Sequence, residues 1–172
     1  HNVRIEEISG KLTDHYEPRS NVIRLSSGVY HSTSVASIGV ACHEAGHAVQ
    51  YAKGYAPIRI RAAIIPLTNA GSALSLPLLL IGLIFNFQGL ALLGIALFAL
   101  STLFQLVTLP VEINASRRAL AAIESGGLLY DDEYPLARKT LTAAALTYVA
   151  ALAVSLAQLL RLLILFGGRR DD

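Results

Sequence analysis

The chain has 172 residues and a net charge of +2, and 53% of its residues are hydrophobic while only 15% are charged. Soluble domains carry about 25% charged residues, so this composition is that of a membrane protein with a modest polar part. The weak charge balance argues against a nucleic-acid partner, and the length allows a single domain over residues 1–172. One cysteine, Cys42, excludes an internal disulfide and suits a reducing compartment.

Residues 1–30 are expected to form a small β element. Residues 3–8 and 22–26 carry β-type side chains and are separated by Gly10 and Pro18, so we predict a pair of strands. The sequence contains no Met, and we therefore expect a trimmed protein that lacks an N-terminal signal or anchor.

Residues 34–53 are predicted to form an amphipathic helix. Ser34 offers an N-cap, as do Ser32 and Thr33, and Gly54 fits a C-terminal stop. Apolar side chains at helical spacing predict a buried face made of Val35, Ile38, Ala41, Ala45, Val49 and Ala52.

This helix carries the run Cys42-His43-Glu44-Ala45-Gly46-His47. Because residues four apart share one helix face, His43 and His47 can direct two imidazoles at one metal ion. Glu44 then lies beside the ion without having to bind it. This is the zincin arrangement, in which two histidines hold Zn²⁺ and the glutamate takes a proton from the water that the metal activates. The alternative is a polar face with two solvated histidines, and the amphipathic helix around the motif argues against it.

Three other side chains near the motif have possible metal roles. Cys42 is a soft donor next to His43, but it turns away from the ligand face, so we interpret it as a small buried residue. His15 and His31 are each a candidate for a spare metal ligand or for a donor to the transition state. The alternative, which is more common for loop histidines, is that they are solvated.

A long uncharged stretch follows the helix. No charged residue occurs from Ala62 to Val111, a length that as helix is about 75 Å, more than two crossings of a ~30 Å hydrocarbon core. We predict transmembrane helices at 64–85 and 90–109, with the polar residues 86–89 as the turn. The alternative, a buried hairpin in a soluble protein, is disfavoured by two adjacent uncharged segments of about 20 residues. A third apolar run at 141–166 is also long enough to span.

The segment 111–125 is predicted to be a separate helix that begins after Pro110 and stops at Gly126. Glu112 is the first charge after the uncharged stretch, where the hairpin returns to the side of the histidines, and it is our candidate for a third metal ligand. The alternative is that Glu112 only favours the positive N-terminal end of its helix. Asn114 and Ser116 are candidates for orienting a ligand.

The distribution of Lys and Arg predicts the orientation in the membrane. Most of these residues fall on the side of the metal helix, namely Lys53, Arg59, Arg61, Arg117, Arg118, Arg138 and Lys139. The predicted hairpin tip has none. We therefore expect the catalytic side to face the cytoplasm of a bacterial-type cell membrane.

Three blocks, at residues 14–19, 42–50 and 109–119, resemble the YugP-type membrane zinc metallopeptidases, which are similar to the HtpX-like gluzincins. The resemblance covers nearly the whole chain. It implies one zinc per chain bound by His43, His47 and Glu112, with Glu44 catalytic. Many gluzincins have Asp where this chain has Ser116, and the family's usual N-terminal membrane segment has no counterpart here.

Together these observations predict a mainly α-helical membrane protein with a zincin-like core, a small β element and three transmembrane helices. We expect a zinc-dependent endopeptidase that hydrolyses peptide bonds of a protein or peptide substrate, with Glu44 as general base. The oxyanion-stabilising group stays open among Tyr148, Tyr134, His15 and an arginine. The alternative is a membrane scaffold or adaptor with a structural metal site, but a structural site has no use for Glu44.

Overall fold

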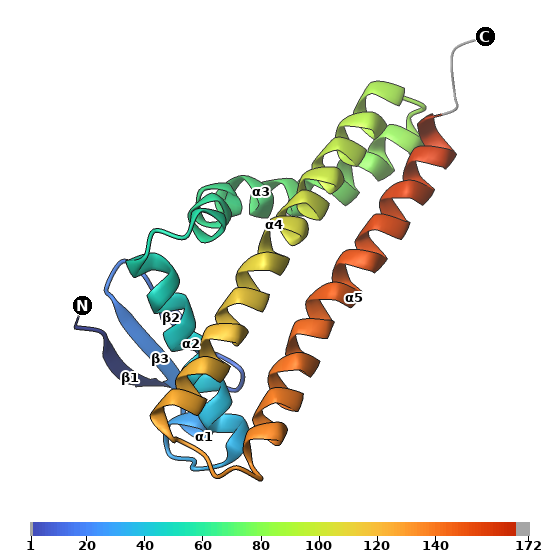
Figure 1. Ribbon diagram of the computed structural model, residues 1–172. Helices are drawn as coiled ribbons and strands as arrows, with labels where there is room; N and C mark the ends of the chain where they lie inside the picture. Colours follow the sequence, from blue (N-terminus) through green and yellow to red (C-terminus); the bar gives the residue numbers. More distant parts are fainter. Residues whose placement is uncertain (1, 168–172) are drawn as a thin grey trace. The chain divides into compact units, whose positions relative to one another are not determined.

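The structure is a computed structural model that describes residues 2–167, which form three strands and five helices (Figure 1). In chain order these are β1 (Arg4–Ile8), β2 (His15–Glu17), β3 (Val22–Ser26), α1 (Ser27–Tyr30), α2 (Val35–Ala52), α3 (Ala56–Ile84), α4 (Gln88–Gly126) and α5 (Tyr134–Gly167). The chain divides into two compact units. The first combines the described residues up to Arg59 with Pro110–Thr147, and the second combines Ile60–Leu109 with the described residues from Tyr148 onward.

The sheet of the first unit has the order β1-β3-β2, with β3 parallel to β1 and antiparallel to β2. The central strand β3 is the most buried, because its apolar side chains Val22, Ile23 and Leu25 all pack inside. The predicted strand pair is therefore correct for β1 and β3. Strand β2 was not predicted, because its three residues are too few to show an alternation of apolar and polar side chains.

Helix α2 begins and ends where the sequence predicts. The Ser34 hydroxyl accepts a hydrogen bond from the backbone N–H of Ser37 at 3.2 Å, and Gly54 follows the helix with a φ of +64°. The predicted buried face is wrong, because Val49 is 38% exposed and Ala52 is also exposed. The buried residues of α2 are instead mostly small or polar, namely Ser37, Gly39, Glu44, Gly46, His47, Ala48 and Gln50.

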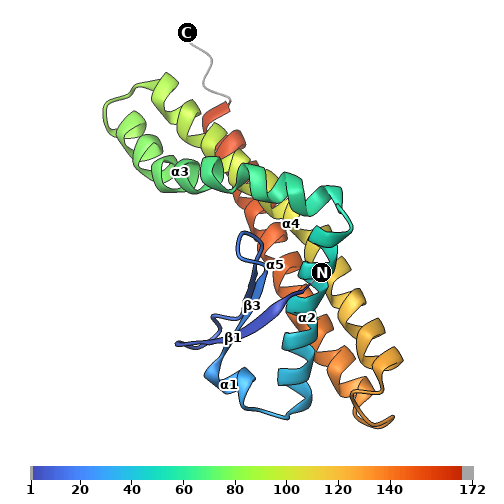
Figure 2. The same ribbon diagram turned by 90° about the vertical axis from the view of Figure 1, so that its left-hand side faces the viewer.

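The reason is a close approach of α2 to the C-terminal half of α4. An ideal Cβ placed on Gly46 would lie 2.6 Å from the backbone oxygen of Ala115, so only glycine allows the two backbones to come this close. Along α4 the residues Val111, Ala115 and Ala119 are completely buried. In both ribbon views α2 runs beside this half of α4 (Figures 1 and 2). The contact brings polar residues of α2 into the interior of the unit.

The second unit contains a hairpin of α3 and α4, together with part of α5. Its apolar core is built from Leu79, Ala91, Ile95 and Leu162. Gly82 and Gly94 permit close backbone contact in the hairpin, because an ideal Cβ on either would lie within 3 Å of backbone atoms of the other helix. Figure 2 shows the hairpin tip between the end of α3 and the start of α4.

Among the described residues, three helices are long and apolar enough to cross a membrane: Ala56–Ile84, Gln88–Gly126 and Tyr134–Phe166. The number of spans agrees with the prediction, but α3 and α5 begin earlier than the expected 64–85 and 141–166. The expected separate helix at 111–125 is wrong, since α4 continues through Pro110 as one helix of 39 residues. Proline removes a single backbone N–H from the helix, and the helix continues because the residues on both sides of Pro110 are also helical.

Candidate metal centre

Three potential ligands meet in the first unit. His43 and His47 lie one turn apart on α2, and Glu112 reaches them from α4. One ligand atom from each of the three lies within 4.8 Å of the others. The Glu112 Oε2 atom is 3.1 Å from Nε2 of His43 and 3.7 Å from Nε2 of His47. The structure thus brings together the three side chains that the sequence singled out.

Because the three side chains are largely buried, an unbalanced charge on any of them is costly. Glu112 is only 3% exposed, and His47 is buried beside it. Burial alone would lower the pKa of His47, but the hydrogen bond and the charge of Glu112 outweigh this effect, and the pKa lies above its ordinary value. The group of three therefore attracts a positive charge.

The distances are compatible with zinc. Ligand bonds of about 2.0–2.2 Å in a tetrahedral shell put neighbouring ligand atoms about 3.3–3.6 Å apart. The two separations from Glu112, 3.1 and 3.7 Å, bracket that range, and all three ligand atoms lie within 4.8 Å of one another. Two imidazoles and one carboxylate form a three-ligand set that leaves a fourth position open, as catalytic zinc sites do. The residues present therefore fit a zinc ion.

Each histidine is also held at its other ring nitrogen. Nδ1 of His43 lies 3.1 Å from the Ser116 hydroxyl, and Nδ1 of His47 lies 2.9 Å from Oε1 of Gln50. Outer contacts of this kind orient the ring and leave Nε2 for the metal. Ser116 was a candidate for this role in the sequence, whereas Gln50 was missed. Its position three residues after His47, on the same helix face, was the available signal.

Glu44 is buried and adjacent in sequence to His43, and it does not belong to the group of three potential ligands. The backbone of Tyr16 in β2 is near this carboxyl group and has a small lowering effect on its pKa. Burial raises the pKa of Glu44 above its ordinary value, and the nearby His47 and His43 oppose that shift without cancelling it. A carboxyl group in this position can take up and return a proton.

Strand β2 relates the sheet to the site. It is an edge strand, because the strand order is β1-β3-β2. Its residue Tyr16 lies near Glu44, since the backbone of Tyr16 affects the pKa of that carboxyl group. An edge of the sheet is therefore close to Glu44.

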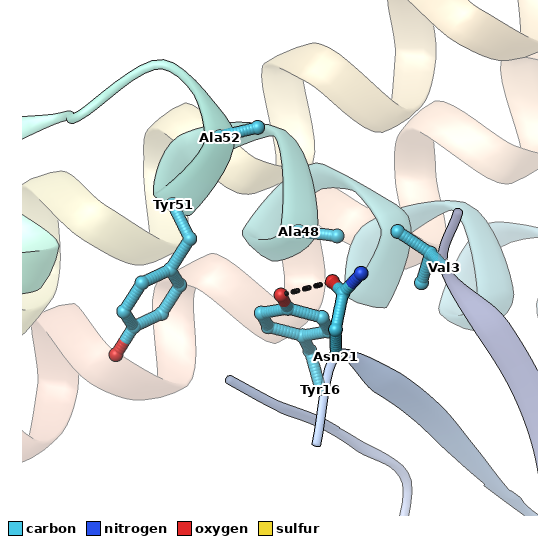
Figure 3. Close-up of a pocket in the computed structure, with 6 residues that line it drawn as sticks. All are labelled: Val3, Tyr16, Asn21, Ala48, Tyr51 and Ala52. Atoms are coloured by element: carbon cyan, nitrogen blue, oxygen red, sulfur yellow. Dashed lines mark hydrogen bonds between the residues drawn. The ribbon is translucent and has the colours of Figure 1, made fainter. Parts of the chain in front are cut away.

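A pocket of about 190 Å³ opens beyond Glu44 along α2 (Figure 3). It is lined by Val3, Tyr16, Asn21, Ala48, Tyr51 and Ala52. The Tyr16 hydroxyl donates a hydrogen bond of 2.7 Å to Oδ1 of Asn21, as the dashed line in Figure 3 marks. These two polar groups bond to each other, and the other walls of the pocket are mainly apolar.

The other candidates from the sequence lie outside the group of three ligands. Cys42 is half-buried and free, in keeping with the interpretation that it turns away from the metal. Nδ1 of His15 lies 2.7 Å from the Thr13 carbonyl oxygen, and the exposed His31 pairs with Glu7 at 3.2 Å. Neither histidine belongs to the metal group among the described residues.

Comparison with known proteins agrees with this site. The chain belongs to the family described as "Putative neutral zinc metallopeptidase", which matches residues 1–167. It is similar to the "Putative membrane protease YugP" of Bacillus subtilis (strain 168), with 45% identity over 172 residues that cover 100% of this chain and 76% of that protein. No solved structure matches the chain. The resemblance found in the sequence is confirmed, and the family makes zinc the cofactor of a membrane protein with three apolar helices.

Proposed function

We propose that this protein is a membrane-bound zinc endopeptidase whose active site faces the cytoplasm. His43, His47 and Glu112 bind one zinc ion, and Glu44 is the general base. The observation that carries the proposal is the position of Glu44, which is buried beside the three ligands and close to Tyr16 of the edge strand β2. A structural metal site in a scaffold protein would have no use for such a group.

Zinc bound by these residues would supply Lewis-acid chemistry, polarising the scissile carbonyl and making water more acidic. Glu44 accepts the proton of the attacking water and returns it to the leaving amine. Ser116 and Gln50 keep the imidazole rings in place through their Nδ1 atoms.

The substrate is a peptide segment in extended conformation. Such a segment can add to the free edge of β2, where backbone hydrogen bonds align it next to Glu44. The pocket beyond Glu44 can take an apolar side chain of the same segment. Three apolar helices hold the enzyme in the bilayer, and the Lys and Arg residues of the predicted inner side support the cytoplasmic orientation.

The test is the substitution Glu44→Gln, which keeps the size of the side chain and removes the base. We expect the variant to retain zinc and fold, and to lose cleavage of a denatured-protein substrate by about 10²–10⁴-fold, the usual contribution of a positioned acid–base group. Zinc content and cleavage are measured on the same preparations of wild type and variant. Retained zinc with undiminished cleavage would refute the role of Glu44, and absence of cleavage in zinc-loaded wild type would favour the scaffold.

A further inference from the structure

We propose that Gln50 is a positioning residue, locked by Asn114 and Arg118, that fixes the proton of His47 on Nδ1 and so presents an unprotonated Nε2 to the metal. This inference rests on the proposed zinc site. It assigns a role to three residues that do not themselves touch the ion.

The direction of each hydrogen bond follows from Arg118. The Arg118 side chain can only donate, and its Nε lies 2.8 Å from Oδ1 of Asn114, so that atom of Asn114 accepts. The same Oδ1 accepts a second hydrogen bond, of 3.0 Å, from Nε2 of Gln50. Gln50 Nε2 also donates to the backbone oxygen of Val111 at 2.8 Å, and a carbonyl oxygen can only accept. Two acceptors thus fix the NH₂ end of Gln50.

The opposite end of Gln50 must then be its carbonyl oxygen. Oε1 lies 2.9 Å from Nδ1 of His47, and because a carbonyl oxygen cannot donate, Nδ1 must carry the hydrogen. A neutral imidazole has one N–H, so Nε2 of His47 keeps its lone pair. That is the nitrogen on the side of Glu112.

Burial makes this constraint effective. Gln50 is completely buried, and its two N–H groups and its carbonyl oxygen all have protein partners. Turning the amide over would place NH₂ against His47 and the carbonyl oxygen against two other acceptors. Such unsatisfied buried groups cost about 1–3 kcal/mol each.

His43 lacks a comparable constraint. Its Nδ1 faces the Ser116 hydroxyl, which can either donate or accept, so this contact does not select a tautomer. Gln50 is therefore the contact that selects the tautomer of its histidine. Its orientation depends on Val111 and Asn114 of α4, the helix that also carries Glu112. The packing of α2 against α4 therefore brings Glu112 to the histidines and also selects the tautomer of His47 that has its hydrogen on Nδ1.

Without Gln50, the His47 proton would prefer Nε2, where the charge of the Glu112 carboxylate, 3.7 Å away, attracts it. Zinc would then have to displace it. We therefore expect Gln50→Met, which keeps the length of the side chain and removes its polar atoms, to weaken zinc binding by about 10–100-fold. Gln50→Glu keeps an acceptor for the Nδ1 hydrogen but sets its second carboxylate oxygen against the acceptors of Val111 and Asn114, so it should recover only part of that loss. The measurement is competition for zinc against a chelating dye on the full chain in detergent.

The matched control is Arg117→Ala against Arg118→Ala. Both remove one positive charge from neighbouring positions of α4, but Arg117 is exposed while Arg118 bonds to Asn114. Zinc affinity should fall only in Arg118→Ala. If Gln50→Met fails to fold, Asn114→Leu and Arg118→Ala carry the test, and wild-type affinity in both would overturn the proposal.

A second readout is independent of activity. Histidine ¹⁵N spectra of the metal-free protein, at a pH where imidazole is neutral, should show His47 with its hydrogen on Nδ1 in wild type and on Nε2 in Gln50→Met. An unchanged His47 tautomer in Gln50→Met, or zinc affinity in Gln50→Met equal to that of wild type, would mean that Gln50 only fills space. Failure of the zinc site itself has a different signature, since wild type and His47→Ala would then bind zinc equally.

Discussion

The close approach of α2 and α4 gives a sharp prediction for the substitution Gly46→Ala. The new methyl group would lie 2.6 Å from the backbone oxygen of Ala115, and two further backbone atoms of Ala115 lie at 3.2 Å. Backbone atoms cannot rotate away, so the helices must separate by roughly 0.8 Å to restore an ordinary contact near 3.4 Å. Gly46 is adjacent to His47, and Ala115 is one turn from Glu112. The separation therefore acts directly on the metal site.

The magnitude follows from two opposing effects. Overpacking of this kind costs about 1–3 kcal/mol, whereas Gly to Ala inside a helix gains about 1 kcal/mol where there is room. Ligand distances in a metal site tolerate only about ±0.2 Å, less than the displacement required. Gly46→Ala should thus lower both the midpoint of denaturation and the affinity for zinc.

The control is Gly39→Ala on the same helix. An ideal Cβ there meets only a side-chain atom of Leu141, at 3.8 Å, so the variant gains helix propensity without a clash. The propensity gain is common to both variants, so they should differ in stability by the overpacking cost, about 1–3 kcal/mol. Denaturation of the metal-free protein in detergent and zinc competition are measured on both. If Gly46→Ala matched Gly39→Ala in stability and zinc affinity, the close helix contact would not exist as described.

Two further predictions concern the membrane part. Gly94→Ala places a methyl group 2.7 Å from the backbone nitrogen of Leu79, so it should lower the denaturation midpoint. The control Gly89→Ala meets only the Phe87 ring, at 3.6 Å, and should not lower it. An unchanged midpoint in Gly94→Ala would contradict the close backbone contact in the hairpin. Single cysteines introduced at residues 86–89 in a Cys42→Ala background should react with an impermeant reagent added outside intact cells, and reaction next to His47 instead would reverse the proposed orientation.

The sequence predicted the local features well, because they depend on short-range patterns. The histidine spacing and the cap at Ser34 place α2 to within one residue. The uncharged stretch predicts two of the apolar helices, and the later apolar run at 141–166 predicts the third. The structure brings Glu112 to the histidines, while the roles of these side chains as zinc ligands stay predictions.

What the sequence could not supply depends on contacts between distant residues. The buried face of α2 is set by Gly46 against Ala115, a backbone contact that has no apolar signature in the pattern. Gln50 resembles any surface glutamine until its partners Val111 and Asn114, more than 60 residues later, are in place. The proline rule placed a helix start at Pro110, but α4 runs through that residue.

The most direct test of the whole account is the zinc content of the purified chain and of Glu112→Ala, determined by elemental analysis after removal of loosely bound metal. Glu112 comes from α4 and is separated in sequence from the histidines of α2, so it reports on the assembled site and not only on the motif. We expect one zinc per chain in the wild type and loss of that zinc in Glu112→Ala. Equal zinc content in the two proteins would show that Glu112 is not a ligand and would contradict the proposed centre.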